Sequence, residues 1–552
     1  MKNSRRILAL MLSLVMCATV LAACGPTAGP AGPGITQQPG APQGTGGQGG
    51  GMMQQIEEGA DHVFADHIDV IMDNNNVGTL NPMNPAANTS PTNWSLVMLF
   101  DRLLNRLDTG EYLPGLATEW HTDDYITFNF RLRQGVVFHN GDPFTAQDVA
   151  NTIDLARESA SLGAAQWHPI ESYRIINDFE IEFTLGAMNV DFYFNLAMAN
   201  AGILNKRAID ADPENGHMIA TGAYKIERFV NNDYIVFLRN HDWWDDVENG
   251  GRRNIVTERI TLRFVPEMST RTIMMQNDES QLSFGTSAED VILFQEDPDN
   301  FQVIPLVFNN PQGFSFNLRD PITGCPYFRQ AVIHAIDKDE IAFFAASEWA
   351  KGVYDGGCGV WGYKTEFRNL DLPPIYQDQA RARELLELSV YNGEEVEIAA
   401  SNTTNIRAAQ AMQAQLRDVG INTTILQLDA PGVATYMANP DGPHQMIFFN
   451  LVVNLSPFSA RQVLYPGAAQ THRSGYNNPE VTQLFDDVAS MLDRNDREVA
   501  FRRIQEIVYE DPPYVSVHWR INAIIAKAGI GGLIIPGDHH QTDMRGLFQI
   551  ID

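Results

Sequence analysis

The stretch that most constrains the fold runs from Tyr125 to Ala156, YITFNFRLRQGVVFHNGDPFTAQDVANTIDLA. Its first part alternates apolar and polar side chains, which is the pattern of a strand with one buried face. Asn140-Gly141 is a strong turn signal, and the period then changes to that of a helix. Thr145 precedes this helix as an N-cap, with Asp148 three residues later. The stretch therefore predicts a strand, a turn and a capped helix.

A second change of period lies farther along the chain. Val396–Ala400 and Ile421–Leu426 are short apolar runs that predict strands. The helix between them has its apolar side chains on one face, at Ala409, Met412, Leu416 and Val419. Gly420 follows as a natural stop. This β-α-β pattern predicts parallel strands with a right-handed crossover, and hence an α/β fold.

The chain is strongly acidic, with 38 Lys and Arg against 68 Asp and Glu among 552 residues, a formal net charge of −30. A surface of this charge repels phosphate backbones, so a nucleic-acid partner is not expected. The length predicts two or three domains rather than one.

The first 23 residues are predicted to be a lipoprotein signal peptide. A basic start at Lys2, Arg5 and Arg6 precedes an apolar run, Ile7–Leu21, that is too short to be a stop-transfer helix. Small residues before Cys24 resemble a lipobox, at which bacterial lipoproteins are cleaved and their cysteine is acylated. The alternative is an ordinary signal peptide that is cut elsewhere. Residues 24–60, rich in Gly, Pro and Gln, are predicted to be a disordered tether.

The run FNFRLRQGVVFHNGDPFTAQDV resembles the signature block of the extracellular solute-binding proteins of ABC importers, family 5, which includes oligopeptide-, dipeptide- and nickel-binding proteins. Asn140 stands where the family usually has Asp. LPGLATEW at 113–120 and YFRQAVIHAIDKDEI at 327–341 resemble two further family blocks. The resemblance covers most of the chain after the tether.

This resemblance implies a two-lobed periplasmic-binding-protein-like α/β fold with an extra sub-domain, its lobes joined by two hinge crossings. The crossings are expected near residues 309–314 and 514–519. Lobe 1 is expected at 61–310, with the sub-domain inserted at about 107–190, and lobe 2 at 311–515. Residues 516–552 are expected to return to lobe 1.

The implied function is capture of a small solute, by family default an oligopeptide, and its delivery to ABC permease subunits. The expected location is the extracytoplasmic face of the cell membrane, with Cys24 as the lipid anchor. Two alternatives remain open: a sugar or metal chelate as the ligand, and a sensor or adhesion lipoprotein without a transport role.

No enzyme and no cofactor are expected. The sequence has no G-x-S-x-G elbow, no H-E-x-x-H zinc helix and no Walker-type loop. His539-His540 is interpreted as a solvent-exposed pair rather than a metal site. Cys325 and Cys358 form either a disulfide or two free thiols, and the sequence does not decide between them.

The candidate ligand-binding residues are predicted to lie either at the mouth of the cleft or on the facing loops of lobe 2. They are Asn76, Thr79, Trp361, Asn450 and Asn454. For each one a structural role is the competing interpretation, namely core packing for Trp361 and turn formation for the asparagines.

One position departs from the peptide-binding pattern. In peptide-binding members of the family, an Asp in a Gly-Trp-x-x-Asp-Tyr-x-x-Pro-like segment pairs with the ligand's α-amino group. When Pro457 is aligned, the Asp position holds Val453 and the flanking aromatic position holds Asn454. A neutral side chain cannot form the charge-assisted pair. Asp441 lies nearby in the sequence as a candidate substitute.

Overall fold

A computed structural model gives the fold. It describes residues 62–72, 77–87, 89–286, 288–347, 350–354, 359–362, 364–429, 432–433, 436, 445–451, 453–468, 474–536 and 541–551. Several predictions fall outside these residues: the signal peptide, the tether, Cys24, Asn76, Cys358, Asp441 and His539-His540. Within the described part, no helix has the length and apolarity needed to cross a membrane.

The largest sheet in the described part has eleven strands, in the order β15-β14-β16-β12-β17-β11-β1-β10-β9-β8, with β13 also paired to β17. The strands are β1 (His67–Met72), β8 (Tyr224–Val230), β9 (Tyr234–Arg239), β10 (Arg259–Phe264), β11 (Leu282–Thr286), β12 (Phe301–Phe316), β13 (Ala350–Gly352), β14 (Glu395–Ser401), β15 (Asn422–Leu428), β16 (Met446–Asn450) and β17 (Tyr514–Lys527).

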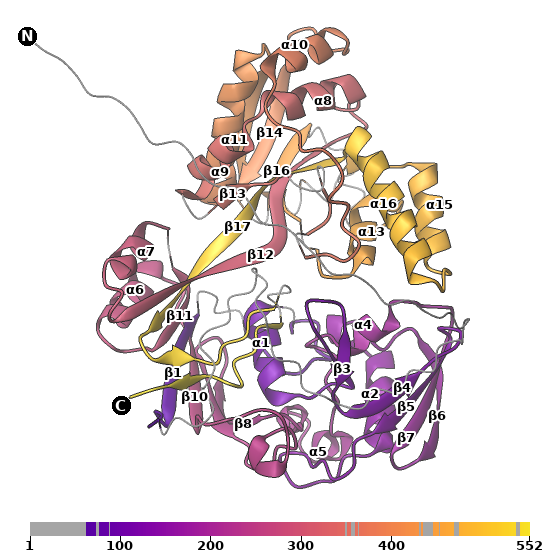
Figure 1. Ribbon diagram of the computed structural model, residues 1–552, viewed down its shortest axis with the longest axis vertical. Helices are drawn as coiled ribbons and strands as arrows, with labels where there is room; N and C mark the ends of the chain where they lie inside the picture. Colours follow the sequence, from indigo (N-terminus) through magenta and orange to yellow (C-terminus); the bar gives the residue numbers. More distant parts are fainter. Residues whose placement is uncertain are drawn as a thin grey trace, which may run out of the picture. The chain divides into compact units, whose positions relative to one another are not determined.

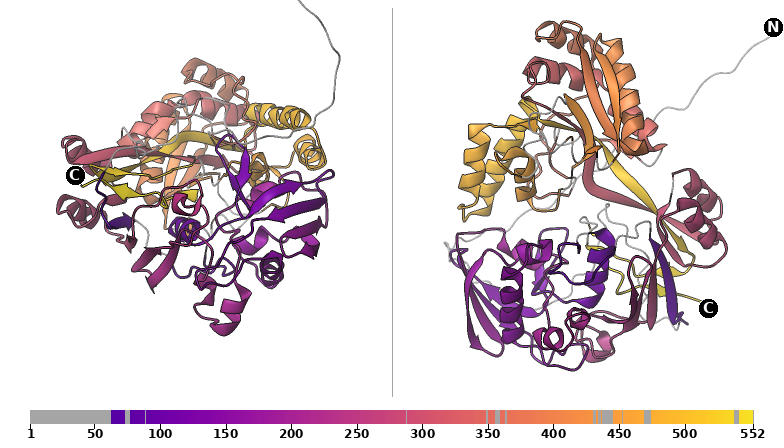
Figure 2. Two further views of the ribbon diagram at one scale, coloured as in Figure 1. Left: turned by 60° about the horizontal axis from the view of Figure 1, so that its bottom comes forward. Right: turned by 180° about the vertical axis from the view of Figure 1, so that it is seen from behind.

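Strands β12 and β17 join the two halves of this sheet. They pair antiparallel from Phe301↔Lys527 to Ser315↔Tyr514, and Figures 1 and 2 show them running side by side. At one end β17 also pairs with β11, and at the other end β12 pairs with β16. The register shifts between Val307 and Pro311. We call the part built on β1 and β8–β11 lobe 1, and the part built on β14–β16 lobe 2.

Lobe 2 contains the predicted β-α-β unit. Strands β14 and β15 are parallel, and α11 (Asn402–Asp418) connects them. Ala409, Met412 and Leu416 are buried on the face of α11 that packs on the sheet, as the helical spacing predicts. Gly420 follows with φ of 93°, a backbone conformation that favours glycine.

Further helices cover lobe 2 (Figure 1). They are α8 (Pro326–Ala335), α9 (Lys338–Ala346), α10 (Gln379–Glu387), η4 (Pro457–Ala460), α13 (Arg461–Leu464), α15 (Pro479–Val488) and α16 (Arg494–Glu510). The first of them buries Phe328, Val332 and Ala335 in the same apolar cluster as α11.

The strand-turn-helix prediction is confirmed in a four-stranded antiparallel sheet of order β4-β5-β7-β6. Its strands are β4 (Ala117–His121), β5 (Thr127–Leu132), β6 (Ile170–Asn177) and β7 (Glu180–Leu185). Phe128, Phe130 and Leu132 of β5 are at most 2% exposed, because alternate residues of the strand face the core. Helix α2 (Ala146–Arg157) begins as predicted, and the Asp148 carboxylate accepts from the Thr145 backbone N–H at 2.9 Å. We call this unit the sub-domain.

The remaining elements surround these sheets. They are α1 (Ser90–Leu99), β2 (Leu104–Arg106), β3 (Tyr112–Pro114), α3 (Leu162–Ala165), α4 (Phe192–Leu196), α5 (Lys206–Ala211), η1 (Gly216–Met218), η2 (Val247–Asn249), α6 (Met268–Gln276), α7 (Ala288–Gln295), β18 (Ile530–Gly531) and β19 (Phe548–Gln549).

The C-terminal segment packs beside lobe 1 residues. The Asp543 carboxylate pairs with Arg253 at 2.7 Å, and Thr257 Oγ1 donates to the Leu547 carbonyl at 2.7 Å. The predicted domain boundaries themselves remain predictions.

Candidate functional site

Asn309 of β12 holds two loops of lobe 2 at the crossing. Its Oδ1 accepts from the backbone N–H of Lys364 at 2.8 Å, and its Nδ2 donates to the Asn454 carbonyl at 3.2 Å. Thr365 Oγ1 donates to the same carbonyl at 2.9 Å. These bonds bring the segment of Trp361 close to the segment of Asn454, although almost a hundred positions separate them in the sequence. Two of the predicted site residues therefore lie on loops fixed to one crossing strand.

Trp361 is only 3% exposed and packs in an apolar cluster that also holds Phe449, Leu451 and Val453. This packing agrees with the structural interpretation of the residue. Its indole Nε1, however, has no hydrogen-bond partner among the described residues. A buried donor left unpaired costs about 1–3 kcal/mol. The N–H of Trp361 is therefore a polar group that a bound ligand or a water can satisfy.

A second unpaired polar atom lies on the other crossing strand. His518 of β17 is 1% exposed, and within the described part of the chain its Nε2 has no partner. Burial lowers the pKa of His518 to about 4, so the imidazole is neutral at pH 7. Its neighbour Trp519 lies under the guanidinium of Arg368, at 5.5 Å from Cζ to the ring centroid. The lobe 2 end of the crossing thus carries aromatic rings, a neutral imidazole and one guanidinium.

The two asparagines of the prediction differ in their surroundings. Asn450 ends β16 opposite Gln312 of β12 and is exposed. It therefore lies at the carboxyl end of a strand parallel to β14, where open α/β sheets place their ligands. Asn454 is partly buried, and its Oδ1 accepts from the Ser456 backbone N–H at 2.9 Å, which fits the turn-forming interpretation.

Val453 stands where the alignment on Pro457 predicts that peptide-binding members carry the acid. It is 4% exposed, and its backbone N–H donates to Asn310 Oδ1 at 3.1 Å. The side chain belongs to the same apolar cluster as Trp361. An α-amino group has no carboxylate to pair with at this position.

Thr79 lies in lobe 1, apart from the lobe 2 loops in sequence. Its Oγ1 accepts from the Asn81 backbone N–H at 3.1 Å, so the described hydrogen bond of this side chain is a local one. The role of Thr79 as a ligand contact stays a prediction, as do the roles of the other candidate residues.

The sequence analysis missed a set of contacts between lobe 2 and the first part of the chain. Ser456 Oγ donates to the Asp191 carboxylate at 2.6 Å, and Lys364 forms an ion pair with Asp108. Arg106 and Glu366 are 3.5 Å apart. Side-chain pairs between loops so far apart in the chain leave no periodicity, so no signal in the sequence pointed to them.

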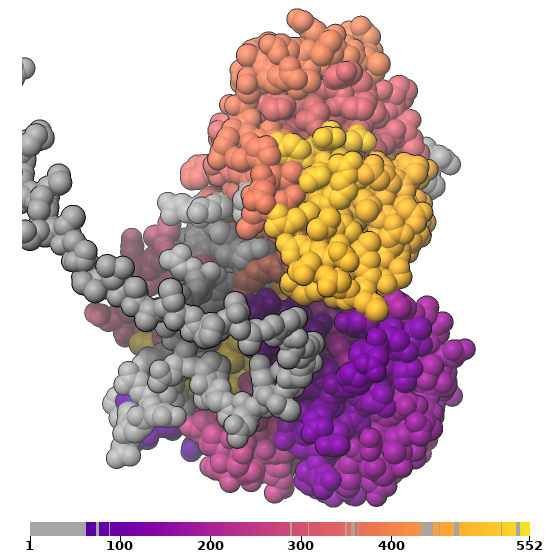
Figure 3. Space-filling view, turned by 45° about the vertical axis from the view of Figure 1, so that its right-hand side comes forward, coloured from indigo at the N-terminus to yellow at the C-terminus, as the bar shows by residue number. Residues whose placement is uncertain are grey.

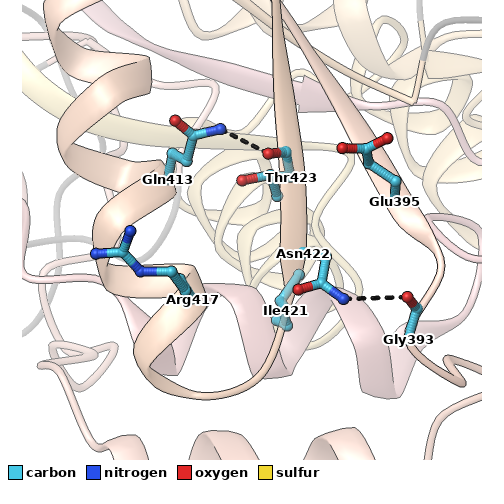
Figure 4. Close-up of a pocket in the computed structure, with 7 residues that line it drawn as sticks. All are labelled: Gly393, Glu395, Gln413, Arg417, Ile421, Asn422 and Thr423. Carbon is cyan, nitrogen blue, oxygen red and sulfur yellow. Dashed lines mark hydrogen bonds between the residues drawn. The ribbon is translucent and has the colours of Figure 1, made fainter.

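A hollow of about 460 Å³ lies elsewhere in lobe 2, at the amino ends of β14 and β15 (Figure 4). Gln413 Nε2 donates to the Thr423 carbonyl at 2.6 Å, and Asn422 Nδ2 donates to the Gly393 carbonyl at 3.1 Å. Ligands of open α/β sheets bind at the carboxyl ends of the strands. This hollow is therefore a poor candidate for the ligand site.

Comparison with known proteins identifies the family. Over residues 111–472, more than half of the chain, the sequence matches the family described as "Bacterial extracellular solute-binding proteins, family 5 Middle". The dipeptide-binding protein of Escherichia coli (strain K12) is 24% identical over 518 residues, covering 84% of this chain and 92% of the relative. The nickel-binding periplasmic protein of the same organism is 22% identical over 502 residues, covering 83% of this chain and 90% of the relative.

A solved structure shows the same fold. The crystal structure of a putative peptide binding protein AppA from Clostridium difficile superimposes with a TM-score of 0.76 at 18% identity, covering 88% of this chain and 100% of that one. The predicted two-lobed binding-protein fold is thereby confirmed, and so is the expectation of a binding protein rather than an enzyme. The chain belongs to the bacterial extracellular solute-binding proteins of family 5.

Proposed function

We propose that this protein captures a short peptide between lobes 1 and 2 and delivers it to the permease of an ABC importer. The observation that carries the proposal is the family match over residues 111–472. It is supported by the similarity to the dipeptide-binding protein of Escherichia coli. The paired crossing strands β12 and β17 supply the hinge that such a mechanism needs.

Capture works by closure of the two lobes around the ligand. A ligand can shift the balance between open and closed forms only by the difference in its affinity for the two forms. It must therefore contact both lobes. In this proposal Trp361, Asn450 and Asn454 supply contacts from lobe 2, and Thr79 supplies one from lobe 1. Asn76 belongs to the same set but lies outside the described residues.

A metal chelate or a sugar is the second candidate ligand. The observation that favours it is the burial of Val453, an apolar side chain that takes the position of the expected anchoring acid when Pro457 is aligned. The nickel-binding relative shows that the family includes a protein named for a metal. A peptide would need another acid for its ammonium group, and Asp441 remains the candidate.

Attachment to the membrane is part of the proposal. Residues 1–23 would be removed as a signal peptide, and Cys24 would carry the lipid at the extracytoplasmic face. A single acyl chain gives only reversible binding to the membrane, whereas more than one acyl chain gives a stable anchor. Delivery to a permease, rather than sensing or adhesion, predicts loss of solute uptake when the gene is deleted.

Thermal unfolding against a ligand panel tests the proposed ligand class. The panel holds short peptides with free or acetylated amino termini, small oligosaccharides, and nickel with a chelator. A ligand at 100 times its dissociation constant adds about 2.7 kcal/mol to the free energy of unfolding when it binds only the folded state.

Each outcome of the panel has a definite meaning. Stabilisation by free but not by acetylated peptides supports peptide capture with an acid that replaces the missing one. Stabilisation by oligosaccharides or nickel chelate alone would contradict the peptide proposal and assign the second ligand class.

A further inference from the structure

Lobe 2 touches the first part of the chain away from the crossing strands. Ser456, just before η4, donates to the carboxylate of Asp191, just before α4, at 2.6 Å. Lys364 pairs with Asp108 in the turn between β2 and β3. In Figure 3 the yellow segment of lobe 2 lies next to the purple, amino-terminal part of the chain. We call these four residues the inter-lobe clasp.

The clasp lies beside a hollow that opens to solvent. The hollow has a volume of about 520 Å³ and is lined by residues from both sides of the clasp. Its lining includes His168, Asn189, Asp191, Phe458, Arg461 and Ala489. Asp191 is partly buried and lines this hollow, whereas Ser456 is only 3% exposed. The Asp191 carboxyl can therefore exchange a proton with solvent while its bond to Ser456 is in place.

We propose that Asp191 and Ser456 make closure of the lobes depend on a proton, which Asp191 holds in the closed form and releases when the lobes open. Opening separates Asp191 from Ser456 and returns the carboxyl to water. Closing places the same carboxyl against lobe 2, where an ionised oxygen loses hydration. A protonated carboxyl avoids that loss and still makes the hydrogen bond to the serine hydroxyl.

The groups that face Asp191 shift its pKa in opposite directions. Burial is the largest influence and raises the pKa of Asp191, and the nearby Glu366 also raises it. The Ser456 hydroxyl and the guanidinium groups of Arg106 and Arg497 lower it, and the net pKa is about 7.

Two other titratable groups lie close. The phenol of Tyr112 has a pKa raised above its usual range by burial, so it stays neutral. His168 lines the hollow, but its Nε2 bonds the carbonyls of Ala156 and Ser159 within the sub-domain. Its contacts therefore do not cross between the lobes.

The sign of the pH dependence follows from the difference between the pKa of Asp191 in the closed form and its pKa in the open form. Asp191 binds its proton more tightly in the closed form than in the open form, so a fall in pH favours closure. The closed form is favoured most below the ordinary aspartate pKa of 3.8, and this gain is lost as pH rises through about 7. Between pH 8 and pH 6 the ratio of closed to open molecules should rise about tenfold, because the closed-form pKa of about 7 lies midway in this interval and closure takes up a full proton only below it.

The inference rests on the proposed function only because closure is what retains the solute. Small-angle X-ray scattering of the full chain without any ligand tests it, so the result does not depend on which ligand the protein binds. The radius of gyration is measured at pH 6 and pH 8 at fixed ionic strength. We expect a smaller radius at pH 6 for the unaltered protein.

Three variants separate the clasp from other causes. Asp191→Asn cannot ionise and keeps a hydrogen-bonding amide, so we expect the smaller radius at both pH values. Asp108→Asn removes the ion pair with Lys364 but keeps Asp191, so the difference between the two pH values should remain. His168→Gln should also keep that difference, because it removes only the neighbouring imidazole.

Two results would overturn the inference. One is a radius of gyration that is the same at pH 6 and pH 8 in the unaltered protein. The other is a pH-dependent radius that survives Asp191→Asn or disappears with His168→Gln. Neither result bears on peptide capture, which the ligand panel tests separately.

Discussion

Asn309 shows how a single amide can organise the candidate site. It lies on β12 and is 1% exposed, with both ends of its side chain bonded to lobe 2 loops. The sequence predicts a crossing at this place. The partners Lys364 and Asn454 lie 55 and 145 positions away, and hydrogen bonds over such separations leave no local pattern. The organising role of Asn309 was therefore not predictable from the residues around it.

Replacing this amide tests its structural role. Asn309→Ala removes the two partly buried hydrogen bonds that this amide makes to the Lys364 N–H and the Asn454 carbonyl. We expect the free energy of unfolding to fall by about 1–3 kcal/mol, from the loss of two hydrogen bonds. Urea unfolding followed by far-UV circular dichroism gives the value.

Asn392→Ala is the matched control, because Asn392 is exposed and its amide donates locally, to the nearby Val390 carbonyl. The control should change the free energy of unfolding by less than about 0.5 kcal/mol. Equal effects of the two replacements would contradict the role assigned to Asn309.

The unpaired indole of Trp361 leads to a prediction about binding. Trp361→Phe keeps an aromatic ring in the cluster and removes the N–H. If a ligand accepts from this N–H, affinity for the stabilising ligand of the panel should fall about two- to tenfold, the value of one hydrogen bond.

The same change should alter the free energy of unfolding little, because the loss of packing is offset by removal of an unpaired donor. Isothermal titration calorimetry and urea unfolding measure the two quantities. Unchanged affinity would show that Trp361 only packs, which is the structural interpretation of the residue.

At the scale of elements, the periodicity of apolar residues predicted which face of a single strand or helix is buried. The alternation in β5 and the helical spacing in α11 each give a buried face at the expected residues, because one side of each element packs on a core. The length of β12, 16 residues, was not predictable in this way. Its pairing with β17 joins Phe301 to Lys527, and no local pattern encodes a partner so distant.

The buried face of α11 predicts that shortening one of its side chains lowers the free energy of unfolding strongly. Met412 is 0% exposed within the lobe 2 core. Met412→Ala should lower the free energy of unfolding by about 2–5 kcal/mol, because it removes buried methylene groups and leaves a cavity. Gln410 lies on the exposed side of the same helix, and Gln410→Ala should change the free energy of unfolding by less than about 0.5 kcal/mol. Thermal unfolding of both variants checks the difference, and similar melting temperatures would be inconsistent with the assigned face.

At the scale of the whole molecule, the sequence resemblance predicted the two-lobed fold because the family's motifs are spread along most of the chain. The ligand contacts were less predictable. The loops that carry Trp361 and Asn454 are both bonded to Asn309, whereas Thr79 makes a local hydrogen bond in lobe 1. Which of them touches the solute depends on how the lobes approach each other, and side-chain types in a single sequence do not specify that approach.

The proposed membrane attachment is also a property of the whole molecule, and in that proposal it depends on Cys24. Cys24→Ala should move the protein from the membrane pellet to the soluble fraction, because the acyl chains supply the anchoring free energy. Fractionation with an immunoblot, and mass spectrometry of the amino-terminal fragment, provide the measurement. Unchanged pelleting together with an unmodified amino-terminal mass would rule out the lipid anchor.

Direct recovery of bound solute tests the central claim of peptide capture. The protein is incubated with a mixture of synthetic di- to pentapeptides, oligosaccharides and nickel chelate, separated from unbound solute by gel filtration, and acidified. Mass spectrometry then identifies what is released. Peptide capture predicts that a subset of the peptides is retained in an amount comparable to that of the protein. Retention of oligosaccharide or nickel chelate without any peptide would contradict it.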